Sequence, residues 1–157
     1  MPRVSYNPKT DIYTGELMVF LDEEPIAFSS SAQLQVSMDT KDSSNKMSGD
    51  WDVPLPGKKN FQITTDSLLT ALTGAKSADT IIAAIIAGTT FGFFFGAAKK
   101  TEAGDSATYA KDTAKANYTG TLLPTECTIK SDNGTIASCS STFKGVGALT
   151  PVAAVVA

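Results

Sequence analysis

Few side chains in this sequence could do chemistry. The 157-residue chain has no histidine and two cysteines. It therefore cannot form a Ser–His or Cys–His nucleophilic pair or a histidine-ligated metal site. Two cysteines also cannot complete a four-cysteine zinc site. The residue inventory alone excludes the commonest catalytic and structural-metal arrangements.

The remaining chemical motifs are weak. Asp50 and Asp52 lie two residues apart in a segment rich in small polar residues, where they could share a cation. A hard cation needs several more oxygen ligands, so we expect both carboxylates to be solvated. Gly145-Val-Gly147 resembles half of a dinucleotide fingerprint but lacks the third glycine and the strand-to-helix setting. We expect no catalytic residues, no cofactor and no metal, and hence no enzyme.

The C-terminal third is typical of a long β-hairpin. Asn133 and Gly134 supply turn chemistry between two strand-like segments. A three-residue loop over residues 132–134 would place Leu123 opposite Phe143 on a mostly apolar face. Pro124 would then lie at an edge or a bulge, because proline cannot donate a ladder hydrogen bond.

The same register would place Cys127 opposite Cys139. This arrangement leaves two interpretations, a disulfide or a pair of buried thiols. In a reducing cytoplasm the pair of thiols is the simpler prediction. A redox-active pair would need an exposed, electropositive setting, which these strands do not indicate.

The elements around these residues are organised by residues 80–98, which contain no charge. Spanning a membrane needs about 20 apolar residues. We instead predict a short helix capped by Asp79 and ended by Gly88, and then a strand over residues 91–95. Isoleucines recur on one helical face before Gly88, whereas threonine and phenylalanine dominate after it.

The N-terminal half is predicted to contain mainly strands. Residues 16–22, 25–38 and 58–65 show apolar alternation or β-favouring residues. A second short helix is expected over residues 67–73, and residues 99–117 are expected to hold a loop and the ragged start of a strand. We predict one domain over residues 1–157, a β-rich α+β fold with a helix pair.

The polar stretch over residues 39–57 is expected to be a long loop, of the kind that is often functional. It contains Trp51, the only tryptophan, which could cover the domain's own core or dock on another subunit. The apolar tail over residues 146–157 should likewise be covered by this domain or a neighbour. The candidate subunit-interface residues are Met47, Trp51, Val53, Leu55, Val152, Val155 and Val156.

Charge and targeting signals limit the partners. The formal net charge of −3 argues against tight, non-specific nucleic-acid binding, which relies on a basic surface. The first residues lack the apolar run of a secretory signal, so we expect synthesis for the cytoplasm without membrane insertion. An enzyme, a membrane protein and a β-sandwich binding or adhesion module are the alternatives to a self-assembling structural protein.

Several segments, in this order and spacing, resemble the major tail tube proteins of tailed bacteriophages, in particular the TP901-1-like group. The resemblance covers most of the chain but not residues 99–117. The matching segments are Gly15–Asp22, Pro25–Phe28, Leu34–Ser37, Asp42–Ser44, Ser48–Trp51, Leu55–Gly57, Phe61–Ile63 and Phe143–Leu149.

The resemblance implies an antiparallel β-sandwich or half-barrel flanked by a helix. Such subunits form hexameric rings that stack into a tube around a tape measure protein, between tail terminator and tail-tip proteins. DNA would pass through the tube without tight binding. The virion tail would be assembled in the host cytoplasm. The fold is shared with tube proteins of contractile injection and type VI secretion systems, which remain alternatives.

Overall fold

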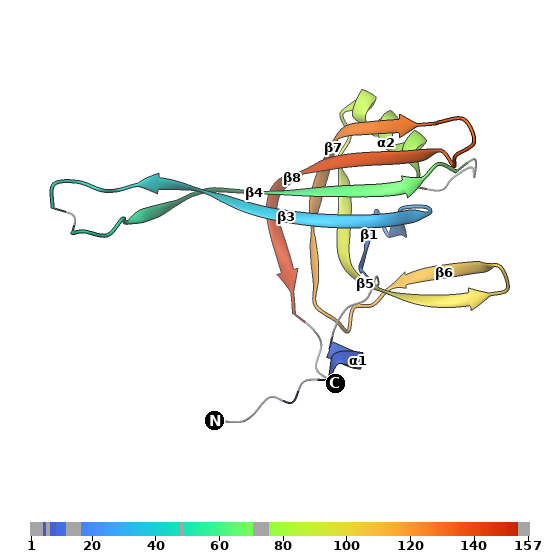
Figure 1. Cartoon of the computed structure of the whole chain (residues 1–157), viewed down its shortest axis with the longest axis horizontal. Helices are drawn as coiled ribbons and strands as arrows, with labels where there is room; N and C mark the ends of the chain where they lie inside the picture. Colours follow the sequence, from blue (N-terminus) through green and yellow to red (C-terminus); the bar gives the residue numbers. More distant parts are fainter. Residues whose placement is uncertain (1–4, 6, 12–16, 48, 71–75, 154–157) are drawn as a thin grey trace.

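The protein is built on one strongly curved antiparallel sheet (Figure 1). The computed structural model describes residues 5, 7–11, 17–47, 49–70 and 76–153. The sheet order is β2-β1-β5-β7-β8-β4-β3, with β6 paired to β5. The strands are β1 (Leu17–Leu21), β2 (Glu24–Pro25), β3 (Ser29–Asp42), β4 (Pro54–Leu68), β5 (Phe91–Ala103), β6 (Ser106–Lys111), β7 (Asn117–Lys130) and β8 (Ser138–Val152). The β-rich α+β half-barrel expected from the sequence is confirmed.

The uncharged stretch over residues 80–98 folds as a helix followed by a strand, as predicted. Helix α2 (Ala78–Ala87) ends at Gly88, whose left-handed φ of 70° suits glycine. The N-cap is Ser77 and not Asp79, which lies in the first turn. A carboxylate there still faces the positive end of the helix dipole. Within the described residues, no helix is long and apolar enough to cross a membrane.

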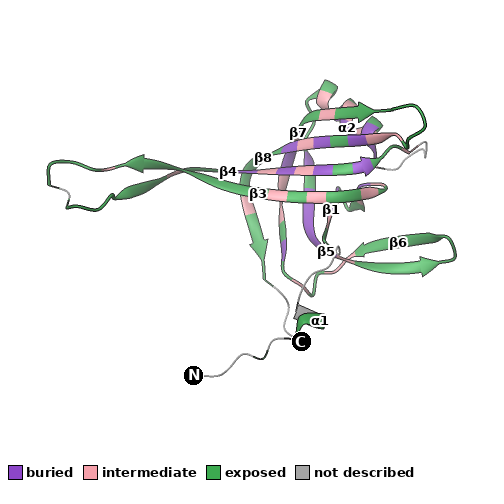
Figure 2. Cartoon of the chain, viewed as in Figure 1, coloured by how far each residue is buried: buried purple, intermediate pink, exposed green. Residues whose placement is uncertain are grey.

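Helix α2 closes one face of the curved sheet and completes the core. It packs against β7 and β8 (Figure 1). Ile81 and Ala84 of the helix join the aromatic and aliphatic side chains of the strands, and the Phe61 and Phe93 ring centroids lie 5.6 Å apart. Figure 2 shows the buried residues gathered where the curved sheet and α2 pack together, and we call this part of the molecule the body. The strand members of the core are Val19, Leu21, Phe61, Ile63, Phe91, Phe93, Phe95, Leu122 and Phe143, joined by Ile26 of the β2–β3 connection.

A smaller aromatic contact lies on the opposite face of β1 and β5. Phe20 and Phe94 pack edge to face with centroids 5.5 Å apart. The Lys111 ammonium lies 5.2 Å above the Phe94 ring and 2.6 Å from the Glu23 carboxylate. The end of β6 therefore anchors the β5–β6 hairpin to the body.

Three expected segments differ in the structure. The helix expected over residues 67–73 is wrong at its start, because Ser67 and Leu68 end β4; residues 71–75 lie outside the described residues. The loop expected over residues 39–57 is shorter, because Thr40 pairs with Pro56 and Asp42 with Pro54. Residues 99–111 form a hairpin of β5 and β6 and not a loop. Solvated hairpins need no apolar face, so their strands lack the expected alternation.

The β7–β8 hairpin forms, but its register differs from the prediction by two residues. Cys127 pairs with Ser141, and Ile129 pairs with Cys139, so the connection spans residues 131–137. A slip of two leaves each side chain on the same face.

The predicted pair of Leu123 with Phe143 is also wrong. A register shift follows Pro124, which pairs with Phe143 as the expected bulge proline. Because the bulge inverts the alternation, Leu122 is buried in the core and Leu123 is only half-buried.

Candidate assembly surfaces

The β3–β4 hairpin extends far beyond the core and carries four of the predicted interface residues at its end (Figures 1 and 2). Met47 is 93% exposed and Trp51 is 86% exposed, while Val53 and Leu55 are each 49% exposed. The alternative in which Trp51 and Leu55 cover the domain's own core is therefore wrong. We call residues 43–47 and 49–53 with Leu55 the hairpin tip.

The hairpin tip is shaped by its own polar groups. The Ser43 amide donates to the Val53 carbonyl at 3.3 Å, and the Ser44 amide donates to the Asp42 carboxylate at 2.8 Å. Hydrogen bonds from the Ser44 hydroxyl and amide lower the pKa of Asp42. The Met47 amide donates to the Asn45 side chain at 2.8 Å. These local bonds hold the turn while its large apolar side chains point to solvent.

A groove of about 850 Å³ lies between the β5–β6 hairpin and the corner where β1, β2 and β3 meet. Its lining includes Leu17, Met18, Phe28 and Tyr109. Phe28 is 56% exposed and has a φ of 52°, which is rare for an aromatic residue. Strained, exposed residues tend to occur at functional sites. Phe28 is not among the predicted interface residues, because the strand-like sequence around it gives no sign of a positive φ.

The predicted tail residues are placed only in part. Val152, at the end of β8, is 38% exposed and pairs with Asn117 of β7. Val155 and Val156 lie outside the described residues. The structure therefore brings Met47, Trp51, Val53 and Leu55 together on the hairpin tip, and it places Val152 separately on β8.

The face of the β3-β4-β8-β7 region that points away from the core is mostly uncharged and polar. Ladder pairing places its side chains in rows across the four strands. Its four charged side chains sum to zero, two positive and two negative. We call this the polar face; its members are Ser31, Gln33, Gln35, Gln62, Thr64, Asp66, Leu68, Leu123, Glu126, Thr128, Lys130, Ser138, Ser140, Thr142 and Lys144.

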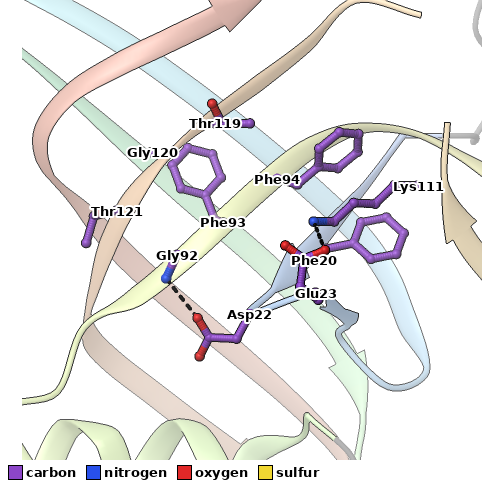
Figure 3. A pocket seen from close by; sticks show the side chains of 10 residues that line it. All are labelled: Phe20, Asp22, Glu23, Gly92, Phe93, Phe94, Lys111, Thr119, Gly120 and Thr121. Atoms are coloured by element: carbon purple, nitrogen blue, oxygen red, sulfur yellow. Dashed lines mark hydrogen bonds and ion pairs between the residues drawn. The ribbon is translucent and has the colours of Figure 1, made fainter. Parts of the chain in front are cut away.

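An open pocket of about 590 Å³ lies beside β1 and β5, and Figure 3 shows two polar contacts among the residues that line it. The Asp22 carboxylate accepts from the Gly92 amide at 3.0 Å, and Lys111 pairs with Glu23. Among the described residues, no group of three or more His, Cys, Asp or Glu side chains could hold a metal ion. Asp50 and Asp52 are exposed on the hairpin tip, as expected.

Comparison with known proteins identifies the fold. No protein-family model matches the sequence, and no curated protein sequence is significantly similar to it. Solved structures do match over nearly the whole chain. The tail of an empty gene transfer agent particle, with C6 symmetry, contains a chain 17% identical with a TM-score of 0.66, covering 95% of this chain and 100% of that one.

Two further structures have the same fold. The sheath–tube complex of an extracellular contractile injection system contains a chain 16% identical with a TM-score of 0.62, covering 92% of this chain and 93% of the other. The SPP1 tail tube gives 6% identity and a TM-score of 0.62, covering 92% and 81%. At these identities the likeness establishes the fold.

Proposed function

We propose that this protein is a structural subunit of a tail tube, assembling as stacked, hexameric rings that form a conduit for genome delivery. The observation that carries the proposal is an exposed apolar hairpin tip on a fold that matches tail and tube assemblies over at least 92% of the chain. Apolar surface of this kind marks a protein–protein contact. The particle would be a virion tail of the TP901-1-like kind, put together in the cytoplasm of a bacterial host.

The proposed contact joins two different surfaces of the chain. The hairpin tip of one subunit would dock on the body of a neighbour, and the groove containing Phe28 is the apolar hollow suited to receive it. A contact between unlike surfaces repeats head to tail and produces an open-ended polymer. Val152, with Val155 and Val156, would add to the subunit contact at the end of β8.

The polar face is suited to the lumen. Its positive and negative charges sum to zero, so it lacks the basic surface that binds DNA. Its hydroxyl and amide groups also leave it without a large apolar patch for a protein partner to bind. DNA would pass along it without tight binding, after a tape measure protein has occupied it during assembly. Tail terminator and tail-tip proteins would close the two ends of the tube.

The proposal is tested by polymerisation. We expect concentrated, purified protein, or protein seeded with tail-tip complexes, to form tubes visible by negative-stain electron microscopy. Deleting residues 43–50 should block growth while the circular-dichroism spectrum stays that of the folded protein. Ile136→Ser is the matched control, because Ile136 is 74% exposed on the β7–β8 connection. Normal tubes from the deletion variant, or monomers of the unaltered protein under all conditions, would overturn the proposal.

A tube of a contractile injection system is the second candidate, favoured by the match to a sheath–tube complex. Such a tube must bind a sheath, whereas a tube without a sheath need not. Co-expression with sheath subunits followed by co-sedimentation separates the two. A binding or adhesion module would instead remain monomeric in size-exclusion chromatography with light scattering at every concentration.

A further inference from the structure

Two thiols meet inside the β7–β8 hairpin. Cys127 of β7 and Cys139 of β8 are both free, and their Sγ atoms lie 3.2 Å apart. The Ser141 hydroxyl oxygen lies 3.4 Å from the Cys139 sulfur and 3.7 Å from the Cys127 sulfur. The chain contains no other cysteine. Any intramolecular disulfide must therefore join these two residues.

The strand register explains how the two sulfurs come together. Cys127 pairs with Ser141 and Cys139 pairs with Ile129, so the cysteines are diagonal neighbours on the same face. Diagonal neighbours are about 7–8 Å apart along the backbone, farther than directly opposed residues, so closing a disulfide here needs some movement of the strands. A disulfide bond is about 2.04 Å long, so the sulfurs need to approach by roughly 1.2 Å. Side-chain rotation with a small strand adjustment can supply this movement.

The surroundings keep the Cys127 thiol protonated at neutral pH. Cys139 is buried, and Cys127 is half-buried below helix α2. Burial, followed by the hydrogen bond with Cys139, raises the pKa of Cys127 to about 11. The titratable groups acting on Cys127 are Cys139 on β8 and Asp79 on α2, and both disfavour the thiolate. Since the thiolate is the attacking species, the Cys127 thiol should react slowly, and a reducing compartment should keep the pair as thiols during synthesis.

We propose that Cys127 and Cys139 form a reversible intramolecular disulfide when the folded protein meets a small-molecule disulfide. One thiol loses its proton and attacks the small disulfide, releasing one small thiol and leaving a mixed disulfide on the protein. The second thiol then loses its proton and displaces the second small thiol. Two protein thiols are oxidised and one small disulfide is reduced to two thiols, so atoms and electrons balance.

The bond would fix the end of the hairpin that helix α2 covers. It closes a loop over residues 128–138, which includes the exposed connection with Ile136. The unfolded chain would lose conformational freedom, and the folded chain would change little. A protein that passes from a reducing compartment to an oxidising medium would gain stability from the bond. The inference does not depend on the proposed tube function.

The test uses the full chain and oxidised glutathione. Folded protein is equilibrated with the oxidant at pH 8 and then alkylated under denaturing conditions for intact-mass analysis. We expect monomer lacking two hydrogen atoms, with no alkylated thiols. Reduced glutathione should reverse the change. The thermal midpoint should rise by about 5–10 °C, from a loop-closure contribution spread over a domain of this size. Oxidation should also be faster at pH 9 than at pH 7.

Two controls make the result decisive. Cys127→Ser should stop at the glutathione adduct, with no rise in the midpoint. The unaltered chain in denaturant shows how readily the same disulfide forms when the protein is unfolded. Both chains are compared at a ratio of oxidised to reduced glutathione at which the unfolded chain forms the disulfide. If the folded protein keeps both thiols at that ratio, or stops at the glutathione adduct, the fold opposes the bond and the proposal is overturned. Disulfide-linked dimers in place of the monomer would also overturn it.

Discussion

The β3–β4 hairpin has apolar side chains at both ends, but only the end inside the body buries them. Phe61 and Ile63 are 4% and 0% exposed, whereas Val53 and Leu55 are each 49% exposed. A register shift between Met38 and Thr40 separates the two pairs along the ladder, so the stripe that faces the core does not simply continue to the tip. The same hairpin therefore joins apolar residues that are buried in the core to apolar residues that are exposed at the tip.

The buried end of the hairpin should contribute to the stability of the single chain, and the exposed end should contribute to assembly. A buried aliphatic or aromatic side chain contributes about 1.5–3 kcal/mol relative to its exposed state. The base of the hairpin provides this contribution within one chain. The tip would provide it only after contact with a second copy. Substitutions at the base should therefore reduce the free energy of unfolding, and substitutions at the tip should leave that energy unchanged and impair polymerisation.

The largest effect is expected from Phe143→Ala on β8, the strand that pairs with the base of the hairpin. Phe143 is fully buried, pairing with Ile63 and Pro124 across its two neighbouring strands. Its truncation should lower the free energy of unfolding by about 3–5 kcal/mol, because it removes a large side chain and leaves a cavity. Urea denaturation followed by circular dichroism measures the change. Ile136→Ala, on an exposed side chain, should change it by less than about 0.5 kcal/mol. Equal losses of unfolding free energy in the two variants would contradict the expectation that stability depends on the buried residues.

A smaller effect is expected from Gly145→Ala, also on β8, which lies against Phe61 at the base of the hairpin. A Cβ atom at Gly145 would lie closer to the Phe61 ring than carbon atoms can approach, so the buried ring must move. Overpacking of this kind costs about 1–3 kcal/mol. Gly49→Ala is the matched control, because a Cβ atom on that tip residue would meet open space. Thermal unfolding of the two variants gives the difference, and a stable Gly145→Ala protein would show that Phe61 has room to shift.

The sequence predicted the elements that have strong local signals. Gly88 marks the end of α2, and the change from isoleucine to phenylalanine marks the start of β5. The β7–β8 register could not be predicted in the same way. A slip of two residues preserves the sorting of side chains between faces, so the apolar pattern does not distinguish the two registers. The bulge after Pro124 then changed which leucine reaches the core.

The candidate site was predictable in its composition but not in its shape. Trp51 and Met47 stood out as large apolar residues in a polar segment, and the structure places both at the exposed tip. The hairpin that carries them was missed, because a ladder solvated on both faces needs no alternation of residue types. The groove was missed because it is formed by segments far apart in sequence and by the positive φ of Phe28.

Substituting Phe28 in the groove should change the free energy of unfolding in the opposite direction. Phe28→Gly should raise the free energy of unfolding by about 0.5–1 kcal/mol, because glycine adopts a φ of 52° without strain. The same change should slow tube growth if the aromatic ring receives a neighbour. Phe28→Ala removes the ring and keeps the strained backbone, so it should impair growth without the gain in stability. Growth at the normal rate in both variants would remove the groove from the proposed contact.

The smallest effect on stability, with a large effect on assembly, is expected from Trp51→Ala. Trp51 is 86% exposed, so its truncation should change the free energy of unfolding by less than about 0.5 kcal/mol. An interface anchor of this type contributes about 2 kcal/mol or more, so the concentration needed for polymerisation should rise about 30-fold. Sedimentation of tubes across a dilution series measures that concentration. Trp51→Phe should polymerise at a concentration between those of the unaltered protein and Trp51→Ala, since it keeps an aromatic ring. A loss of unfolding free energy above 1 kcal/mol would mean that the indole packs on its own chain, and the tip would then belong to the folding surface after all.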